Sequence, residues 1–290
     1  MKADLAEALV KAVNAPGTEL ARASLVVARI ECPRLDPDPY VARLDAMGEA
    51  ARRAIEQHAS ETGDSSAHGS LLALNTYLFE ELGFVGNRDR YDDPRNSCLN
   101  EVLDRRTGIP LTLSIVYMEV ARRAGLQIDG INFPGHFLVR CPDLAAAGHL
   151  VIDPFHGGAL LSEQRCRLLL EKHVGQEVAF SRSLLEPATR LQILVRMLLN
   201  LKRNYVHLRS FPQALVVTEL LLSVNPSAFT ELRDRGLLAY HLNDVAGALR
   251  DLQTYLKLSS MSEMDQEARA EQGQIWEHVK TLRRRVAALN

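Results

Sequence analysis

The sequence has few cysteines, and none of them lies in a recognisable pair. Its 290 residues include four, which are Cys32, Cys98, Cys141 and Cys166, and no two of these form a CxxC motif. This scatter argues against the disulfide framework of a small secreted protein and against a structural zinc site built on cysteine pairs. We therefore expect reduced thiols, as in a cytoplasmic protein.

The sequence also lacks a strong net charge and any long apolar run. Its 34 basic and 36 acidic residues give a net charge of −2, so charge gives no reason to expect nucleic acid or an anionic membrane as a partner. No apolar run approaches the ~18 residues of a membrane span. The first residues, MKADLAEALVKAV, interrupt their apolar face with charges, unlike a signal peptide. We expect a cytoplasmic protein with no nucleic-acid partner and no membrane partner.

What the sequence does contain is ordinary globular composition, with 47% apolar and 24% charged residues. The length suits one large domain or two ordinary ones. Apolar residues recur at helical spacing through much of the first third of the chain. This spacing predicts helices at about 4–13, 19–30, 40–58 and 71–82.

Residues 108–155 form the stretch around which the chain is organised. Leu113, Val116 and Val120 recur at helical spacing and predict a helix over 109–124. Pro110 suits the first turn, where its missing N–H would have no intrahelical partner. Gly125 suits the C′ position that ends such a helix.

Two strands, HFLVR and HLVID, follow this helix and flank CPDLAAAGH, which predicts a hairpin. A turn centred near 144–145 would place Arg140 opposite His149. The same register places His136 directly opposite Asp153, with Cβ atoms roughly 4.5–5.5 Å apart. A one-residue slip would put the two side chains on opposite faces, so the pairing depends on the register.

A carboxylate beside an imidazole suggests either catalysis or structure. It fixes the tautomer of the histidine and raises its basicity, as in sites that activate a thiol or a hydroxyl. On the residues alone, a structural hydrogen bond between His136 and Asp153 is favoured. A metal site is a further alternative, but His149 lies four strand positions, about 13 Å, from Asp153. His156 could approach, yet we assign no metal and no cofactor.

The last third of the chain contains a repeat. Aligning 195–228 with 229–262 gives a period of 34 and matches Ala214 with Ala248. In the second unit, Gly236 and Ala248 are small residues 12 positions apart, which allows two antiparallel helices to cross closely. The first unit has Lys202 at the position of that glycine. The period resembles that of tetratricopeptide repeats, and a last helix at about 265–287 would cap the stack.

The run RNSCLNEVLDRRTGIPLTLSIVYMEVARRAGL, with INFPGHFLVR and DPFHGG after it, closely resembles the SirB1 family. These are bacterial proteins that join a transglutaminase-like domain to tetratricopeptide repeats. The resemblance implies an α+β, papain-like domain with a catalytic Cys at a helix start, a His on the next strand and an Asp on the following one. Laid onto this chain, the last two are His136 and Asp153, and the cysteine position falls on Pro110.

Because proline has no nucleophile, the activity of transglutaminase-like enzymes cannot be transferred to this chain. Ser114, one turn after Pro110, and Cys98, in the preceding helix, are the candidate substitutes. A serine inside a helix is more often a packing residue, and a cysteine among apolar neighbours is usually inert. Asn96 could line a groove with Pro110, or could cap the helix that follows.

We therefore predict a transglutaminase-like domain over residues 1–184 and a tetratricopeptide-like domain over 185–290. The leading hypothesis is a non-catalytic scaffold or regulator that binds a peptide or protein through its repeats. The alternative is an acyl-transfer or amide-hydrolysing enzyme that uses His136 and Asp153 with a substitute nucleophile. The sequence does not indicate the oligomeric state.

Overall fold

The computed structural model describes residues 2–14, 20–143, 148–175, 178–259 and 266–289. The chain divides into two compact units. One comprises residues 12–197, and the other comprises residues 1–11 together with 198–290. The boundary at 184 stays a prediction, and each unit is described separately below.

The unit of residues 12–197 is an α+β domain, as predicted. Every helix expected from apolar spacing in its sequence is present, and α4 continues into a π-helical segment at Thr76–Glu81. Its α-helices are α2 (Leu20–Ala28), α3 (Asp38–Thr62), α4 (Ala67–Asn75), α5 (Leu99–Arg105), α6 (Pro110–Arg123) and α7 (Glu163–Val174), whereas most of α1 (Lys2–Asn14) belongs to the other unit.

Helix α6 is the centre of this unit, because every residue from Pro110 to Ala121 is buried. Pro110 occupies the first helical position, and Gly125 follows the end with a φ of 92°. Both agree with the roles expected from the sequence. A helix that is apolar nearly all round must be covered on every side. The remaining elements of the unit provide that cover.

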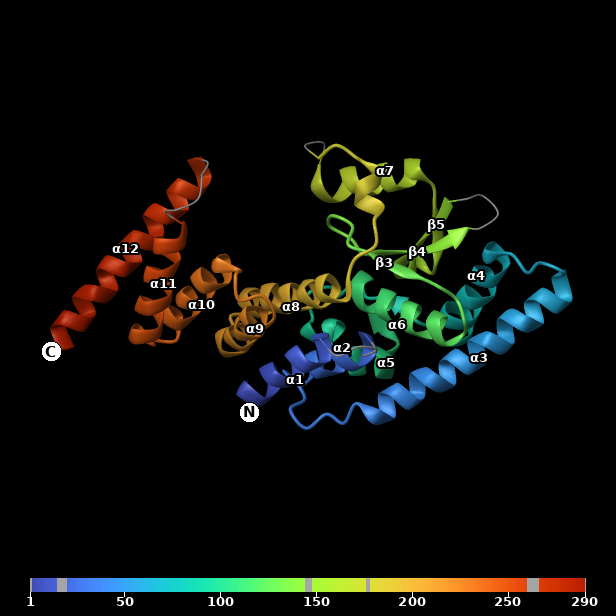
Figure 1. Cartoon of the computed structure of the whole chain (residues 1–290), viewed down its shortest axis with the longest axis horizontal. Coiled ribbons are helices and arrows are strands. Elements are labelled where there is room, and N and C mark those ends of the chain that lie inside the picture. Colours follow the sequence, from blue (N-terminus) through green and yellow to red (C-terminus); the bar gives the residue numbers. More distant parts are fainter. Residues whose placement is uncertain (1, 15–19, 144–147, 176–177, 260–265, 290) are drawn as a thin grey trace. The chain divides into compact units, whose positions relative to one another are not determined.

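The sheet consists of four antiparallel strands in the order β3-β4-β5-β6. It lies between α6 and α7 (Figure 1). Buried residues of the sheet and of α7, among them Leu138 and Leu170, form one apolar cluster with Phe133 of the turn after β3. Strand β6 was not predicted. The strands are β1 (Val85–Gly86), which pairs in parallel with β2 (Thr107–Gly108), and β3 (Asp129–Ile131), β4 (Leu138–Asp143), β5 (Gly148–Asp153) and β6 (Ala159–Leu161).

The predicted register of the β4–β5 hairpin was wrong by two residues. Arg140 pairs with Val151 rather than with His149, and His149 pairs with Pro142. The expected turn at 144–145 lies outside the described residues. A shift of two preserves the face of every side chain, because the side-chain period of a strand is two. His136 therefore lies just before β4 and reaches Asp153 diagonally instead of from directly across.

The predicted repeat lies in the other unit, except that α8 begins in the unit of residues 12–197. Its helices are α8 (Arg190–His207), α9 (Phe211–Val224), α10 (Phe229–His241), α11 (Val245–Ser259) and α12 (Gln266–Leu289). Helices α9 and α11 begin 34 positions apart, and so do the ends of α8 and α10. A Cβ added to Gly236 would lie 2.7 Å from the side chain of Leu252. The glycine thus permits the close crossing of α10 and α11.

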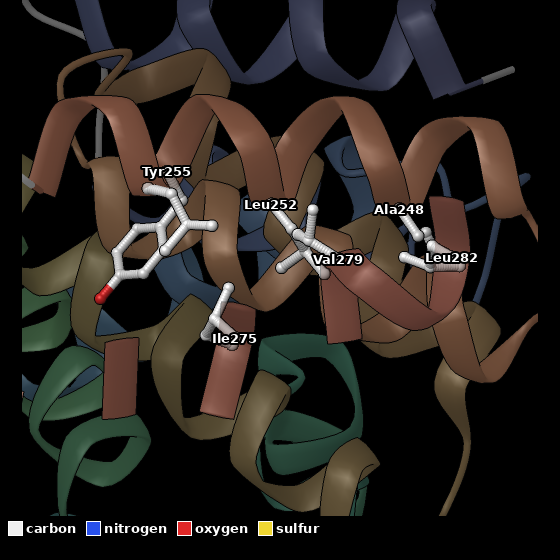
Figure 2. Packing of buried hydrophobic residues seen from close by; sticks show 8 residues of the cluster. Ala248, Leu252, Tyr255, Ile275, Val279 and Leu282 are labelled. Carbon is white, nitrogen blue, oxygen red and sulfur yellow. The ribbon is translucent and has the colours of Figure 1, made fainter. Parts of the chain in front are cut away.

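The capping role expected for the last helix agrees with its packing. Ile275, Val279 and Leu282 of α12 are buried against Leu252 and Tyr255 of α11 (Figure 2). Over the described residues, no helix is both long enough and apolar enough to cross a membrane.

Candidate functional site

A tight turn positions His136. In the sequence Phe133-Pro-Gly-His136, the N–H of His136 donates to the carbonyl oxygen of Phe133 at 3.1 Å. Proline in the second position and Gly135 at a φ of 71° in the third match a type II turn. A Cβ on Gly135 would collide with the side chain of His173 on α7. The Pro-Gly pair therefore sets the direction of the chain and also lets α7 approach.

Asp153 ends β5 and begins a short 3₁₀ helix, Pro154–His156. Its Oδ1 accepts the backbone N–H of Phe155 at 3.0 Å, which is the bond of an N-cap. The side chain of Asp153 is nearly fully buried. The Asp-Pro pair thus explains why a carboxylate is held rigidly in the interior.

His136 and Asp153 are in direct contact, as the diagonal relation of their strands allows. Nε2 of His136 lies 3.0 Å from both carboxylate oxygens. A second imidazole joins them, because Nδ1 of His156 lies 2.7 Å from Oδ2. Burial raises the pKa of Asp153, but the hydrogen bonds and charges of His136 and then His156 outweigh it. The net pKa is below the usual value, so the carboxylate is ionised at neutral pH.

Further rings surround His136, whose side chain is 3% exposed. The ring of His173 stacks on it at 5.4 Å between centroids, and that of His156 at 5.9 Å. Phe155 meets it edge-on at 6.0 Å. Burial, and then the charge of His136, lowers the pKa of His173. His173 was not among the residues singled out from the sequence, since no local motif marks it.

Neither candidate nucleophile is hydrogen-bonded to His136. The thiol of Cys98 is fully buried and donates to the carbonyl oxygen of Pro94 at 3.7 Å. Burial, and then the charge of Glu31, raises its pKa. The hydroxyl of Ser114 is also fully buried and makes no hydrogen bond, so it is not bonded to His136. Helix α6, which begins at Pro110, packs against β4 and the Pro154–His156 turn.

Asn96 is buried, and its side chain forms hydrogen bonds within the loop before α5. Its amide nitrogen donates to the carbonyl oxygen of Arg90 at 2.6 Å, and its amide oxygen accepts from Asn87 at 3.0 Å. It does not cap α5, whose N-cap residue is Cys98. The backbone oxygen of Asn96 accepts the hydroxyl of Thr112 at 2.7 Å, which joins this loop to α6. These bonds hold the loop in place.

Three side chains, His136, Asp153 and His156, present possible metal-ligand atoms within 4.8 Å of one another. His149 is exposed on β5 and is not part of this group. The sequence-based estimate that His149 is too distant and that His156 could approach therefore agrees with the geometry.

The fold and the buried His–Asp pair define an α+β domain of the papain-like type followed by helical repeats. Residues 38–199 match the family model of the transglutaminase-like superfamily, and residues 201–283 match a tetratricopeptide-repeat model. The chain belongs to the family of the UPF0162 and SirB1 proteins, in which a transglutaminase-like domain precedes tetratricopeptide repeats. The resemblance expected from the sequence is thus confirmed.

Among the relatives, the UPF0162 protein of Xylella fastidiosa (strain Temecula1) is 41% identical over 238 residues, covering 81% of this chain and 82% of that protein. Protein SirB1 of Salmonella typhimurium is 29% identical over 187 residues, or 64% and 68% of the two chains. F-box only protein 21 of Mus musculus is 39% identical over 110 residues, which are 36% of this chain and 18% of the mouse protein.

Proposed function

We propose that this protein is a non-catalytic, cytoplasmic member of its superfamily that binds a peptide segment through its repeats. The supporting observation is that the catalytic frame has no accessible nucleophile among its candidates. Pro110 occupies the first position of α6, and both Cys98 and Ser114 are sealed from solvent. A nucleophile must be deprotonated by a base within hydrogen-bonding reach. Neither side chain has such a bond to His136.

The thiol of Cys98 is further disfavoured by its electrostatics. Thiolates are stabilised by nearby cations or helix N-termini, and a buried neutral thiol is poorly nucleophilic. Here burial and the acidic neighbour Glu31 both raise the pKa. Cys98 is therefore a packing residue in this proposal.

The binding half of the proposal rests on a groove in the repeat unit. A cavity of about 360 Å³ opens between α8 and α10. Its lining comprises Lys202, Arg203, Val206, Phe211, Asp234, Leu237, Leu238 and His241. Phe211 and His241 stack at 4.7 Å and form a flat aromatic wall. An apolar cavity with a few fixed polar groups suits one or two inserted side chains of an extended peptide.

The polar groups of this groove are held before any partner arrives. Nζ of Lys202 lies 2.8 Å from Glu231 and 2.6 Å from Asp234. The lysine occupies the position where the second repeat has Gly236, so a buried ion pair in one repeat replaces a close helix crossing in the other. Because Lys202 is neutralised by two acids, we expect an apolar or aromatic anchor residue in the peptide rather than an acidic one.

The test is a peptide-display selection on the full chain, followed by fluorescence anisotropy with the enriched peptides. Val206→Asp places a charge in the groove, and Leu208→Asp is the matched control. Both residues are exposed, at 45% and 54%, but only Val206 lines the cavity. We expect Val206→Asp to weaken binding at least about tenfold, or ~1.4 kcal/mol. Equal effects of the two variants, or no enriched peptide, would contradict the proposal.

The second candidate function is acyl transfer or amide hydrolysis, favoured by the 3.0 Å contact of His136 with Asp153. Its assay is turnover of peptide, amide and ester substrates by wild type and by His136→Ala. Turnover that disappears in His136→Ala would refute a non-catalytic role. Loss of that activity in Ser114→Ala or Cys98→Ala would identify the nucleophile.

A further inference from the structure

The imidazoles of His136 and His156 both contact the carboxylate of Asp153, at the start of the Pro154–His156 turn. We propose that His136, Asp153 and His156 form a binding site for a divalent transition-metal ion. The proposal is independent of peptide binding, because the groove lies in the repeat unit and these three residues lie in the other one.

The distances between the three groups suit a shared ion. Nε2 of His136 lies 3.0 Å from Asp153, and Nδ1 of His156 lies 2.7 Å from it. Two ligands of one tetrahedral zinc ion, each bonded at about 2.0–2.1 Å, lie about 3.3 Å apart. All ligand atoms are within 4.8 Å of one another. An ion therefore requires the carboxylate to move outward by a few tenths of an ångström and the two imidazoles to draw together.

The backbone holds the three groups before an ion arrives. In a 3₁₀ helix, side chains three positions apart eclipse each other, which brings His156 back over Asp153. The carboxylate is fixed by its N-cap bond to the N–H of Phe155. His136 is fixed by the Phe133–His136 turn and by the ring of His173 stacked on it. These contacts limit the side-chain freedom that is lost when an ion binds, which favours affinity.

The ligand types select the class of metal. Two nitrogens and one carboxylate are the set that zinc and non-haem ferrous iron accept, whereas Mg²⁺ and Ca²⁺ prefer oxygen ligands. A neutral imidazole carries its one proton on either nitrogen, so a change of tautomer exposes a lone pair to the ion. The side chain of His156 is 38% exposed, whereas those of His136 and Asp153 are 3% exposed. The ion would enter on the His156 side, with solvent in its remaining positions.

The experiment uses the full chain, freed of metal with EDTA, in isothermal titration calorimetry. ZnCl₂ and, without oxygen, a ferrous salt are the test ions, and MgCl₂ is the control. We expect one zinc or ferrous ion per chain with a Kd below about 1 µM and no binding of Mg²⁺. Bound zinc should also raise the melting temperature of the protein, since a ligand of the native state stabilises it.

Two variants decide the assignment. His156→Gln removes a half-exposed ligand and should weaken binding by at least tenfold, which corresponds to ~1.4 kcal/mol, and should reduce the rise in melting temperature. His149→Gln removes an exposed histidine of β5 outside the group and should bind as wild type does. Circular dichroism in EDTA checks that both variants fold. No saturable binding, or unchanged binding in His156→Gln, would overturn the proposal; the latter result would place the ion at another site.

Discussion

The substitution Asp153→Asn tests how much the buried carboxylate contributes to the stability of the transglutaminase-like domain. An asparagine keeps the shape and one acceptor oxygen, so it can still accept the N–H of Phe155 as an N-cap. Its amide nitrogen, however, must then face Nδ1 of His156 and Nε2 of His136. In the wild type, these two contacts, at 2.7 and 3.0 Å, join Oδ2 of the carboxylate to the imidazole nitrogens.

The expected loss follows from these contacts. A hydrogen bond to a charged group contributes about 1.5–3 kcal/mol. His156 is half-exposed and can turn toward water, but His136 is buried and would lose part of its bonding. We therefore expect Asp153→Asn to lower the free energy of unfolding by about 2–4 kcal/mol at pH 7.

The pH dependence gives the prediction its sign. The folded-state pKa of Asp153 is depressed, whereas the unfolded value is about 3.9. The stabilisation by the carboxylate is thus complete well above pH 4 and is lost as the pH falls through the folded-state pKa. The difference between wild type and Asp153→Asn should shrink as the pH falls from about 3.9 through the folded-state pKa of Asp153.

The assay is urea unfolding in EDTA, followed by circular dichroism, at about pH 7 and pH 3.5. Asp45→Asn is the control, because the side chain of Asp45 is 59% exposed and its buried partner Arg123 also pairs with Glu119. We expect it to cost less than about 1 kcal/mol. An unchanged urea midpoint for Asp153→Asn at pH 7, or a difference that fails to shrink below about pH 4, would refute the reasoning.

Three further predictions concern burial and backbone. Cys32 is the one cysteine that is not buried. A thiol reagent should therefore modify Cys32 quickly in the native protein and Cys98 only on unfolding, as measured by mass spectrometry of the modified peptides. Rapid labelling of Cys98 would contradict its burial. Leu252→Ala should cost about 2–5 kcal/mol by calorimetry, whereas Leu258→Ala, at an exposed position of the same helix, should cost little; equal costs would contradict the packing in Figure 2. Gly135→Ala should lower the melting temperature, because a φ of 71° costs an L-residue about 1–2 kcal/mol and the new methyl group would collide with His173 of α7. An unchanged melting temperature would contradict the described turn.

The helices were predictable from the periodic spacing of apolar residues and from the proline and glycine residues at the helix ends. The spacing of Leu113, Val116 and Val120, with Pro110 and Gly125 at the ends, is enough to place α6. The repeat was predictable for the same reason, since a period of 34 recurs wherever helix pairs of equal length stack. Strand β6, with three residues, is too short to leave a periodic signal.

The strand register could not be predicted to the residue. Alternation of side chains fixes which face a residue occupies, but a slip of two positions leaves every face unchanged. The predicted register and the observed register therefore place His136 and Asp153 on the same face of the sheet, and the alternation of side chains cannot distinguish between them. The burial of Cys98 beneath neighbouring elements also depends on tertiary packing, which local spacing does not encode.

The contact of His156 with Asp153, by contrast, was within reach of the sequence. In Asp153-Pro154-Phe155-His156, an aspartate at an N-cap followed by proline signals the start of a helical turn. If that turn is 3₁₀, the residue three positions on must eclipse the cap. The same four letters thus place a second imidazole beside the carboxylate that His136 already contacts, independently of the strand register. This is why the imidazoles of both His136 and His156 converge on the one carboxylate of Asp153.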